Sequence, residues 1–196
     1  PCPIGISGNK LQVPIQESPR SPNSTSVGIY GNFDYFENSF FISRFFDSLS
    51  PDLIGFMIEN SITLHIAGVG LEKLPEAVHP AIYFALKSNN LICNYGKVPD
   101  VAKWAESIDL FILPAFAASG IKIKLYEALL FRKPFLCSSK LIEHLPLQIQ
   151  QSVPSEYIFY SESFCAVECI KNCVSIKAKS RFPRMSSNDI EWFFDC

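Results

Sequence analysis

The chain has 196 residues, of which 48% are hydrophobic and 18% charged. This composition excludes wholesale disorder and predicts one domain with a sizeable core, or two small ones. The 17 basic and 19 acidic side chains give a formal net charge of −2, which argues against a nucleic-acid-binding protein because such proteins usually carry an excess of basic residues. The apolar runs are far shorter than the ~20 residues of a membrane-spanning helix, and the start, PCPIGISGNK, lacks the apolar centre of a signal peptide.

The seven cysteines are interpreted as free thiols in a reducing cytosol. No histidine or fourth cysteine stands at zinc spacing from the group of three near the carboxyl end, so no metal is expected. Buried cysteines of this kind act as small hydrophobic residues. The residues concerned are Cys2, Cys93, Cys137, Cys165, Cys169, Cys173 and Cys196.

Strand and helix patterns alternate along the chain. After an extended lead-in (residues 1–25), short apolar runs predict strands at residues 27–30, 62–67 and 91–94. Helices are expected at residues 36–48, in pieces over 71–88, and at 101–107, where Asp100 is a suitable N-cap. His65 lies within an apolar strand and is expected to be a core residue, whereas Tyr95 could stack on a ligand or pack internally.

The stretch from residue 109 to residue 139 organises the prediction. It contains an apolar strand (109–114), a turn at Gly120, a helix ended by Pro134, and a second strand (134–137). A weak helix (141–152), a strand (157–160) and a helix (162–176) follow. The alternation predicts a Rossmann-like, doubly wound parallel sheet of about six strands over residues 26–180, with a C-terminal helix at 181–196.

Two lysines lie at the start of the central helix, Lys122 and Lys124. The helix dipole disfavours cations at that end, so a bound anion would explain them. Alternatively, Lys124 and Glu127 form an ordinary surface pair three residues apart. The charges alone favour this simpler alternative.

The segment SGIKIKLYEALLFRKPFLCS resembles the nucleotide-sugar-binding segment of the group 1 glycosyltransferases, which are retaining enzymes of GT-B architecture. It is similar to their G-x-K-x-K-x-x-E branch. YGKVPD (95–100) and PCPIGIS (1–7) resemble two further family segments. The more general family motif has a glutamate at the position of Ser119, which puts the usual contact from that position to the donor sugar in doubt.

The resemblance implies a donor site at the carboxyl edge of the sheet. The turn and helix start would hold the donor diphosphate, and Glu127 would accept hydrogen bonds from the ribose. Ser138 is also expected at this edge, because it directly follows a predicted parallel strand. The expected catalytic residues are Lys122 and Lys124, with no metal or cofactor, and the expected donor-binding residues are Gly31, Gly96, Val98, Ser119, Gly120, Ile121, Glu127 and Ser138.

The function implied is that of the donor-binding lobe of a metal-independent hexosyltransferase. The enzyme would transfer a sugar from a nucleoside-diphosphate sugar to a glycan or lipid-linked glycan, as in polysaccharide biosynthesis. An N-terminal acceptor lobe would be the missing partner, and the aromatic C-terminal helix would cross back onto that lobe. The expected location is cytoplasmic, with peripheral membrane association of the full protein left open. Two alternatives remain, a GT-B-like nucleotide-sugar epimerase and a non-catalytic module that kept the fold.

Overall fold

The computed structural model describes residues 24–74, 78–114, 123–131, 133–143, 147–153, 158–159 and 166–179. The predicted C-terminal helix and nearly all of the predicted lead-in lie outside these residues. The domain boundaries proposed from the sequence therefore stay predictions.

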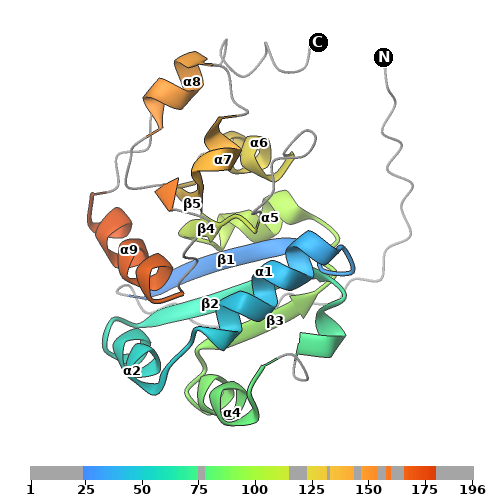
Figure 1. The fold of residues 1–196 in the computed structure, drawn as a ribbon, viewed down its shortest axis with the longest axis vertical. Coiled ribbons are helices and arrows are strands. Elements are labelled where there is room, and N and C mark those ends of the chain that lie inside the picture. The colour runs from blue at the N-terminus through green and yellow to red at the C-terminus, as the bar shows by residue number, and fades with distance from the viewer. Residues whose placement is uncertain are drawn as a thin grey trace.

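Six parallel strands form the sheet, in the order β3-β2-β1-β4-β5-β6 (Figure 1). This order confirms the doubly wound fold, because the chain moves outward from β1 in one direction and then outward from β4 in the other. β1 and β4 are therefore neighbours at the point where the strand order reverses. The strands are β1 (Thr25–Asn32), β2 (Ile62–Val69), β3 (Ile92–Gly96), β4 (Leu110–Ile112), β5 (Phe135–Ser138) and β6 (Ile158–Phe159).

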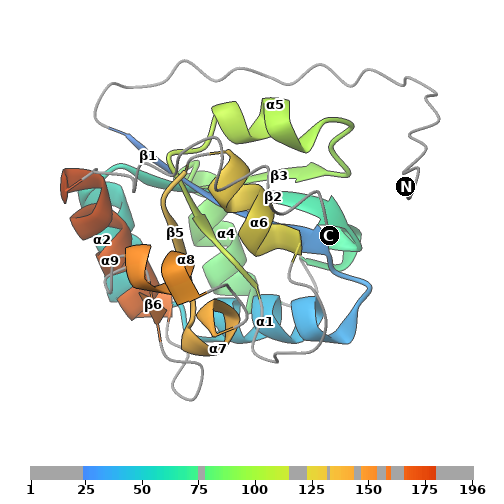
Figure 2. The same ribbon diagram turned by 90° about the horizontal axis from the view of Figure 1, so that it is seen from above.

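Helices cover both faces of the sheet, and Figure 2 shows α1 and α5 on opposite faces. Tyr30 and Phe111, on the two central strands, both contact Trp104 of α5, and Phe111 also contacts Phe131, the residue after α6. The α5 and α6 helices therefore share one face. The helices are α1 (Phe36–Asp47), α2 (Pro51–Glu59), α4 (Pro80–Ser88), α5 (Val101–Glu106), α6 (Ile123–Leu130), α7 (Ser139–Ile142), α8 (Leu147–Ser152) and α9 (Ala166–Lys179), with a 3₁₀ turn, η1 (Leu71–Lys73).

The inner face of α1 shows how the sequence builds the core. Its aromatic residues recur at helical spacing, so Phe41, Phe45 and Phe46 all become fully or almost fully buried. Each such side chain contributes about 1.5–3 kcal/mol relative to an exposed one. Asn38 is also buried on this helix, the only polar side chain so placed among the residues of α1.

Several element boundaries differ from the sequence prediction. β1, β2 and β3 run on through Gly31, Gly68 and Gly96, beyond the predicted strand ends at residues 30, 67 and 94. Pairing across the sheet explains this, since Gly31 pairs with Gly68 in the ladder of β1 and β2 and Ala67 pairs with Gly96 in that of β2 and β3. The local sequence alone favours a strand end at each of these positions, because glycine is frequent in turns.

Two helical regions were also predicted incompletely. α2 was missed, although it carries a recognisable start: Pro51 occupies the first turn, and the Ser50 side chain accepts a hydrogen bond from the backbone N–H of Leu53. The single helix predicted over residues 141–152 is wrong. The described part of that region forms two short helices, α7 and α8.

Candidate donor site at the carboxyl edge of the sheet

The candidate site lies at the carboxyl end of β1, which neighbours β4 where the strand order reverses. In open parallel sheets, ligands bind in the crevice outside the carboxyl ends of the strands where the strand order reverses. Here that crevice receives the last residues of β1 from one side and the side chains of α6 from the other. Four side chains from three elements meet there, and two of them were not predicted from the sequence.

A chain of hydrogen bonds links α6 to β1 through α1. The Nζ atom of Lys124 donates to Oδ1 of Asn38 over 2.8 Å, and Nδ2 of Asn38 donates to the backbone oxygen of Asn32 over 2.7 Å. Asn38 is 8% exposed and Lys124 is half-buried. Because both ends of the Asn38 amide have a partner, the amide orientation is defined and the lysine is held at the end of β1.

Glycine at position 31 makes room for this lysine. A Cβ on Gly31 would lie 2.7 Å from Nζ of Lys124 and 3.3 Å from Nδ2 of Asn38. Its ladder partner Gly68 is constrained more severely, because a Cβ there would overlap the backbone oxygen of Gly31, and its φ is +152°. The ends of β1 and β2 therefore approach closely, and the lysine occupies the space left above Gly31.

Glu127 lies one turn along α6 and has a different partner. The hydroxyl of Tyr30 donates to Oε2 of Glu127 over 2.9 Å and lies 3.3 Å from the backbone oxygen of Lys124. Burial first, and then the charge of Glu127 and the hydrogen bond to it, raise the pKa of Tyr30 well above its ordinary value. The tyrosine thus remains a neutral hydrogen-bond donor at neutral pH.

Lys124 and Glu127 do not form the surface ion pair that the simpler interpretation predicted. Lys124 turns to Asn38 and Glu127 turns to Tyr30. Each charged group is therefore held by a neutral residue of another element. A lysine and a glutamate held apart in this way can serve different parts of a ligand, an anion at one and hydroxyl groups at the other.

The other predicted site residues lie on or just after other strands or outside the described residues, and none is in contact with Lys124 or Glu127 among the interactions described above. Gly96 and Val98 lie at the carboxyl end of β3, separated from β1 by β2, and Val98 packs against the core. Ser138 ends β5 and is fully buried. Ser119, Gly120, Ile121 and Lys122 lie outside the described residues. Of the predicted residues, Gly31, Lys124 and Glu127 are brought together.

Tyr30 and Asn38 are the two residues that the sequence analysis missed. A weak signal existed for each. Asn38 is a polar residue on the aromatic inner face of a predicted helix, and Tyr30 places a hydroxyl at the end of an apolar strand. A buried polar side chain of this kind needs a partner. Nothing local in the sequence identifies that partner.

Tyr95 and His65, about which the sequence left questions, belong to the core. Nδ1 of His65 lies 2.9 Å from the Tyr95 hydroxyl, and the two rings are stacked. Tyr95 also meets the edge of Trp104. The prediction of a satisfied core histidine is confirmed, and of the two interpretations of Tyr95 the packing one describes the structure.

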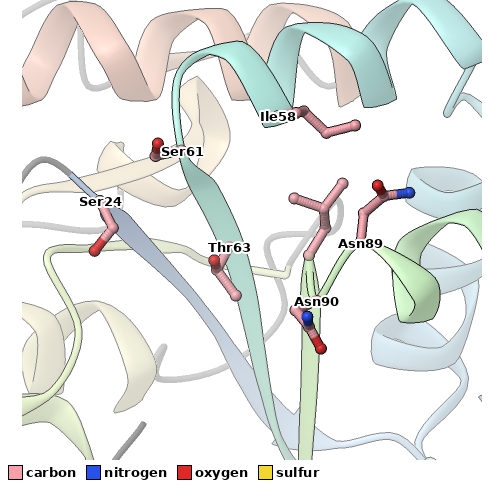
Figure 3. Close-up of a pocket in the computed structure, with 7 residues that line it drawn as sticks. Ser24, Ile58, Ser61, Thr63, Asn89 and Asn90 are labelled. Carbon is pink, nitrogen blue, oxygen red and sulfur yellow. The ribbon is translucent and has the colours of Figure 1, made fainter. Parts of the chain in front are cut away.

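A depression lies at the opposite edge of the sheet, away from the candidate site. It has a volume of about 220 Å³ and lies among the amino ends of β1, β2 and β3 and the last turns of α2 and α4 (Figure 3). Its lining is neutral, so it lacks the charge that a diphosphate requires. The lining residues are Ser24, Ile58, Ser61, Thr63, Asn89, Asn90 and Leu91.

The described residues contain neither a cluster of metal ligands nor a membrane-spanning helix. No group of three or more His, Cys, Asp or Glu side chains in the described ranges could hold a metal ion. In the same part of the chain, no helix is long and apolar enough to cross a bilayer.

The fold and the edge site together define a Rossmann-like α/β domain with a cation and a carboxylate at its strand-order reversal. Sequence comparison then gives the family. The pattern of the family described as Glycosyl transferases group 1 matches residues 26–151, and the chain belongs to that family. No sequence among the curated proteins matches it.

Solved structures share the fold at low sequence identity. The Anabaena protein Alr3699/HepE, crystallised in complex with UDP, has a TM-score of 0.54 and 11% identity, covering 87% of this chain and 44% of that one. The catalytic domain of the cholesterol-alpha-glucosyltransferase from Helicobacter pylori has a TM-score of 0.50 and 14% identity, covering 87% of this chain and 98% of that one. The chain thus spans less than half of the HepE chain, and these likenesses concern the fold.

Proposed function

We propose that this chain is the donor-binding lobe of a glycosyltransferase that uses a nucleoside-diphosphate sugar. The observation that carries the proposal is the position of Lys124, whose ammonium group is held by Asn38 above Gly31, one helical turn from Glu127. The ammonium group would bind the diphosphate and the carboxylate of Glu127 would accept hydrogen bonds from the ribose. Family membership supports this assignment, as does the UDP present in the HepE structure.

The lysines would act on the leaving group. When the bond between the anomeric carbon and the diphosphate oxygen breaks, its electron pair stays on the nucleoside diphosphate, which gains negative charge. A fixed cation placed beforehand at that position stabilises the charge as it develops. Lys124 takes this role together with Lys122, and the acceptor hydroxyl forms the new glycosidic bond as its proton passes to the departing diphosphate. With two lysines available, no metal ion is required.

The finer parts of the proposal follow from the resemblance. The segment would belong to the G-x-K-x-K-x-x-E branch, and the sugar transferred would be a hexose. Gly96 and Val98 would lie against the base, and Ser119, Gly120, Ile121 and Ser138 would complete the donor site. An N-terminal lobe would hold the glycan or lipid-linked acceptor, consistent with the 44% of the HepE chain that this chain covers.

Calorimetric titration with UDP, GDP and ADP tests the donor site. We expect one of the three to bind saturably, and Lys124→Ala or Glu127→Ala to weaken binding at least tenfold, which is about 1.4 kcal/mol. Two exposed residues far from the site provide matched controls, Lys171 on α9 and Glu59 at the end of α2. Their alanine variants should bind like the parent chain.

Two outcomes would contradict the proposal. One is the absence of binding at millimolar concentration both in this chain and in a form that carries the acceptor lobe. The other is binding that the Lys124 and Glu127 variants leave unchanged. Repeating the titration with EDTA and then with Mg²⁺ tests metal independence, since equal affinities are expected.

A further inference from the structure

Tyr30 connects the core of the sheet to the carboxylate of the proposed site. Its ring is edge-on to Trp104 and to Phe111, with centroids 5.8 and 5.4 Å away. Its hydroxyl points away from these aromatic rings and donates a hydrogen bond to Oε2 of Glu127. The residue is only 6% exposed, so it cannot itself contact much of a ligand. An effect of Tyr30 on binding therefore passes through the residues of α6 that its hydroxyl meets, and the shorter hydrogen bond is the one to the Glu127 side chain.

The hydrogen bond fixes one side of the carboxylate. A buried tyrosine hydroxyl that lost its partner would be destabilising, so the bond is expected to persist. A bond to a charged acceptor is also stronger than one between neutral groups. In the described part of the chain, the bond from Tyr30 is the one hydrogen bond that the Glu127 side chain accepts. This bond uses Oε2, and Oε1 remains available as an acceptor.

A glutamate on a helix otherwise samples several rotamers. Immobilising such a side chain on binding costs conformational entropy. Tyr30 orders Glu127 before any ligand arrives, so this cost is met during folding. An ordered carboxylate also discriminates more sharply, because a ligand that lacks the matching hydroxyl leaves a fixed, partly desolvated acceptor without a partner.

We infer that Tyr30 is a positioning residue that holds Glu127 for recognition of the ribose hydroxyls, and so sets the preference for ribonucleoside over deoxyribonucleoside diphosphates. The inference rests on the proposed function, because it assigns Glu127 to the ribose. It adds a residue and a specificity that the resemblance to the family does not imply. Tyr30 acts through Glu127 and takes no part in bond breaking.

Titration with paired ligands tests this role. The nucleoside diphosphate that binds among UDP, GDP and ADP is compared with its 2′-deoxy and 3′-deoxy forms, in the parent chain and in Tyr30→Phe. Phenylalanine keeps the ring against Trp104 and Phe111 and removes only the hydroxyl. We expect the parent chain to prefer the ribose form over at least one deoxy form, and Tyr30→Phe to reduce that preference by roughly threefold to tenfold, the range of one hydrogen bond.

The control is a double-mutant cycle with Glu127→Ala. If Tyr30 acts through Glu127, the change Tyr30→Phe should leave the ribose preference unaltered once Glu127 is alanine. If the role of Tyr30 were purely structural, Tyr30→Phe would reduce the affinities for the ribose and deoxyribose forms equally. Thermal unfolding of each variant confirms that it is folded.

The outcomes separate this inference from the proposed function. If the parent chain binds a nucleoside diphosphate and Tyr30→Phe leaves the ribose preference unchanged, the role of Tyr30 is overturned and the donor site stands. An effect of Tyr30→Phe that persists at full size in the Glu127→Ala background also overturns it. If none of the three diphosphates binds, either to this chain or to a form that carries the acceptor lobe, the proposed function fails and the role of Tyr30 fails with it.

Discussion

The ammonium group of Lys124 lies directly above Gly31, at the place where a side chain of residue 31 would begin. A Cβ there would be 2.7 Å from Nζ, closer than real Cβ contacts allow. The end of a central strand and the first turn of a helix far along the chain are thus fitted to each other. The candidate site depends on a glycine for space and on an asparagine for position.

Replacing Gly31 with alanine should displace the lysine. The new methyl group would push Nζ out of its place above the strand and strain its bond to Asn38. We expect affinity for the nucleoside diphosphate to fall by roughly tenfold, about 1.4 kcal/mol. Calorimetric titration measures the affinity, and thermal unfolding measures the accompanying change in stability. That change should be small, because the obstructing atom is the far end of a flexible side chain.

Gly55 provides the matched control, since it lies inside α2 and a Cβ there would have no atom within 4 Å. Gly55→Ala should raise the free energy of unfolding by roughly 0.5–1 kcal/mol and leave the affinity unchanged. If Gly31→Ala kept the affinity for the nucleoside diphosphate, binding would not require the Lys124 ammonium group to lie above residue 31.

Asn38 offers a test of the charge at the site. In Asn38→Asp, a carboxylate replaces the amide 2.8 Å from the Lys124 ammonium group. The new charge would neutralise the lysine and repel a diphosphate, whereas Asn38→Ala only removes the hydrogen bond between this side chain and the lysine. We expect the aspartate variant to bind the diphosphate more weakly than the alanine variant, by a factor of about ten or more at low salt.

Salt dependence supplies the check on this prediction. Mobile ions screen charge, so the gap between the two variants should narrow as ionic strength rises from about 0.01 M to 1 M. Equal affinities of Asn38→Asp and Asn38→Ala at low salt would show that no anion binds beside Lys124.

Stability should decline at alkaline pH. Burial raises the pKa of the Cys137 and Cys173 thiols and is the largest cause of the raised pKa of Tyr30. These groups stay protonated in the folded chain but ionise once it unfolds, at about pH 8.5 for cysteine and pH 10 for tyrosine. Their raised folded pKa values therefore favour the folded state fully below those pH values, and the free energy of unfolding should fall as pH rises above about 8.5.

Urea unfolding at pH values from about 7 to 10.5 measures this decline. Cys137→Ala should be less stable than the parent at pH 7, because it leaves a cavity. Its slope of stability against pH should nevertheless be shallower, because one ionising thiol is gone. An unchanged slope would assign the alkaline decline to other groups.

Much of the fold could be predicted from local patterns. The apolar runs of β1, β2 and β4 and the aromatic stripe of α1 showed their type, because strand and helix periods are written in neighbouring residues. Asp100 was identified as an N-cap, and its side chain accepts a hydrogen bond from the N–H of Lys103. Gly31, Gly68 and Gly96 were misjudged because their place in strands depends on the partner strand.

The candidate site, like the fold, could be predicted from the sequence only in part. The sequence by itself determined that a lysine and a glutamate stand on successive turns of a helix in a doubly wound domain, and its pattern identified the family. Only the tertiary structure decided that Asn38 holds Lys124 and that Tyr30 holds Glu127. These partners come together because parallel crossover connections bring the ends of β1, α1 and α6 to one edge of the sheet. A hydrogen bond between residues so far apart in sequence is a property of the strand order, which no local pattern contains.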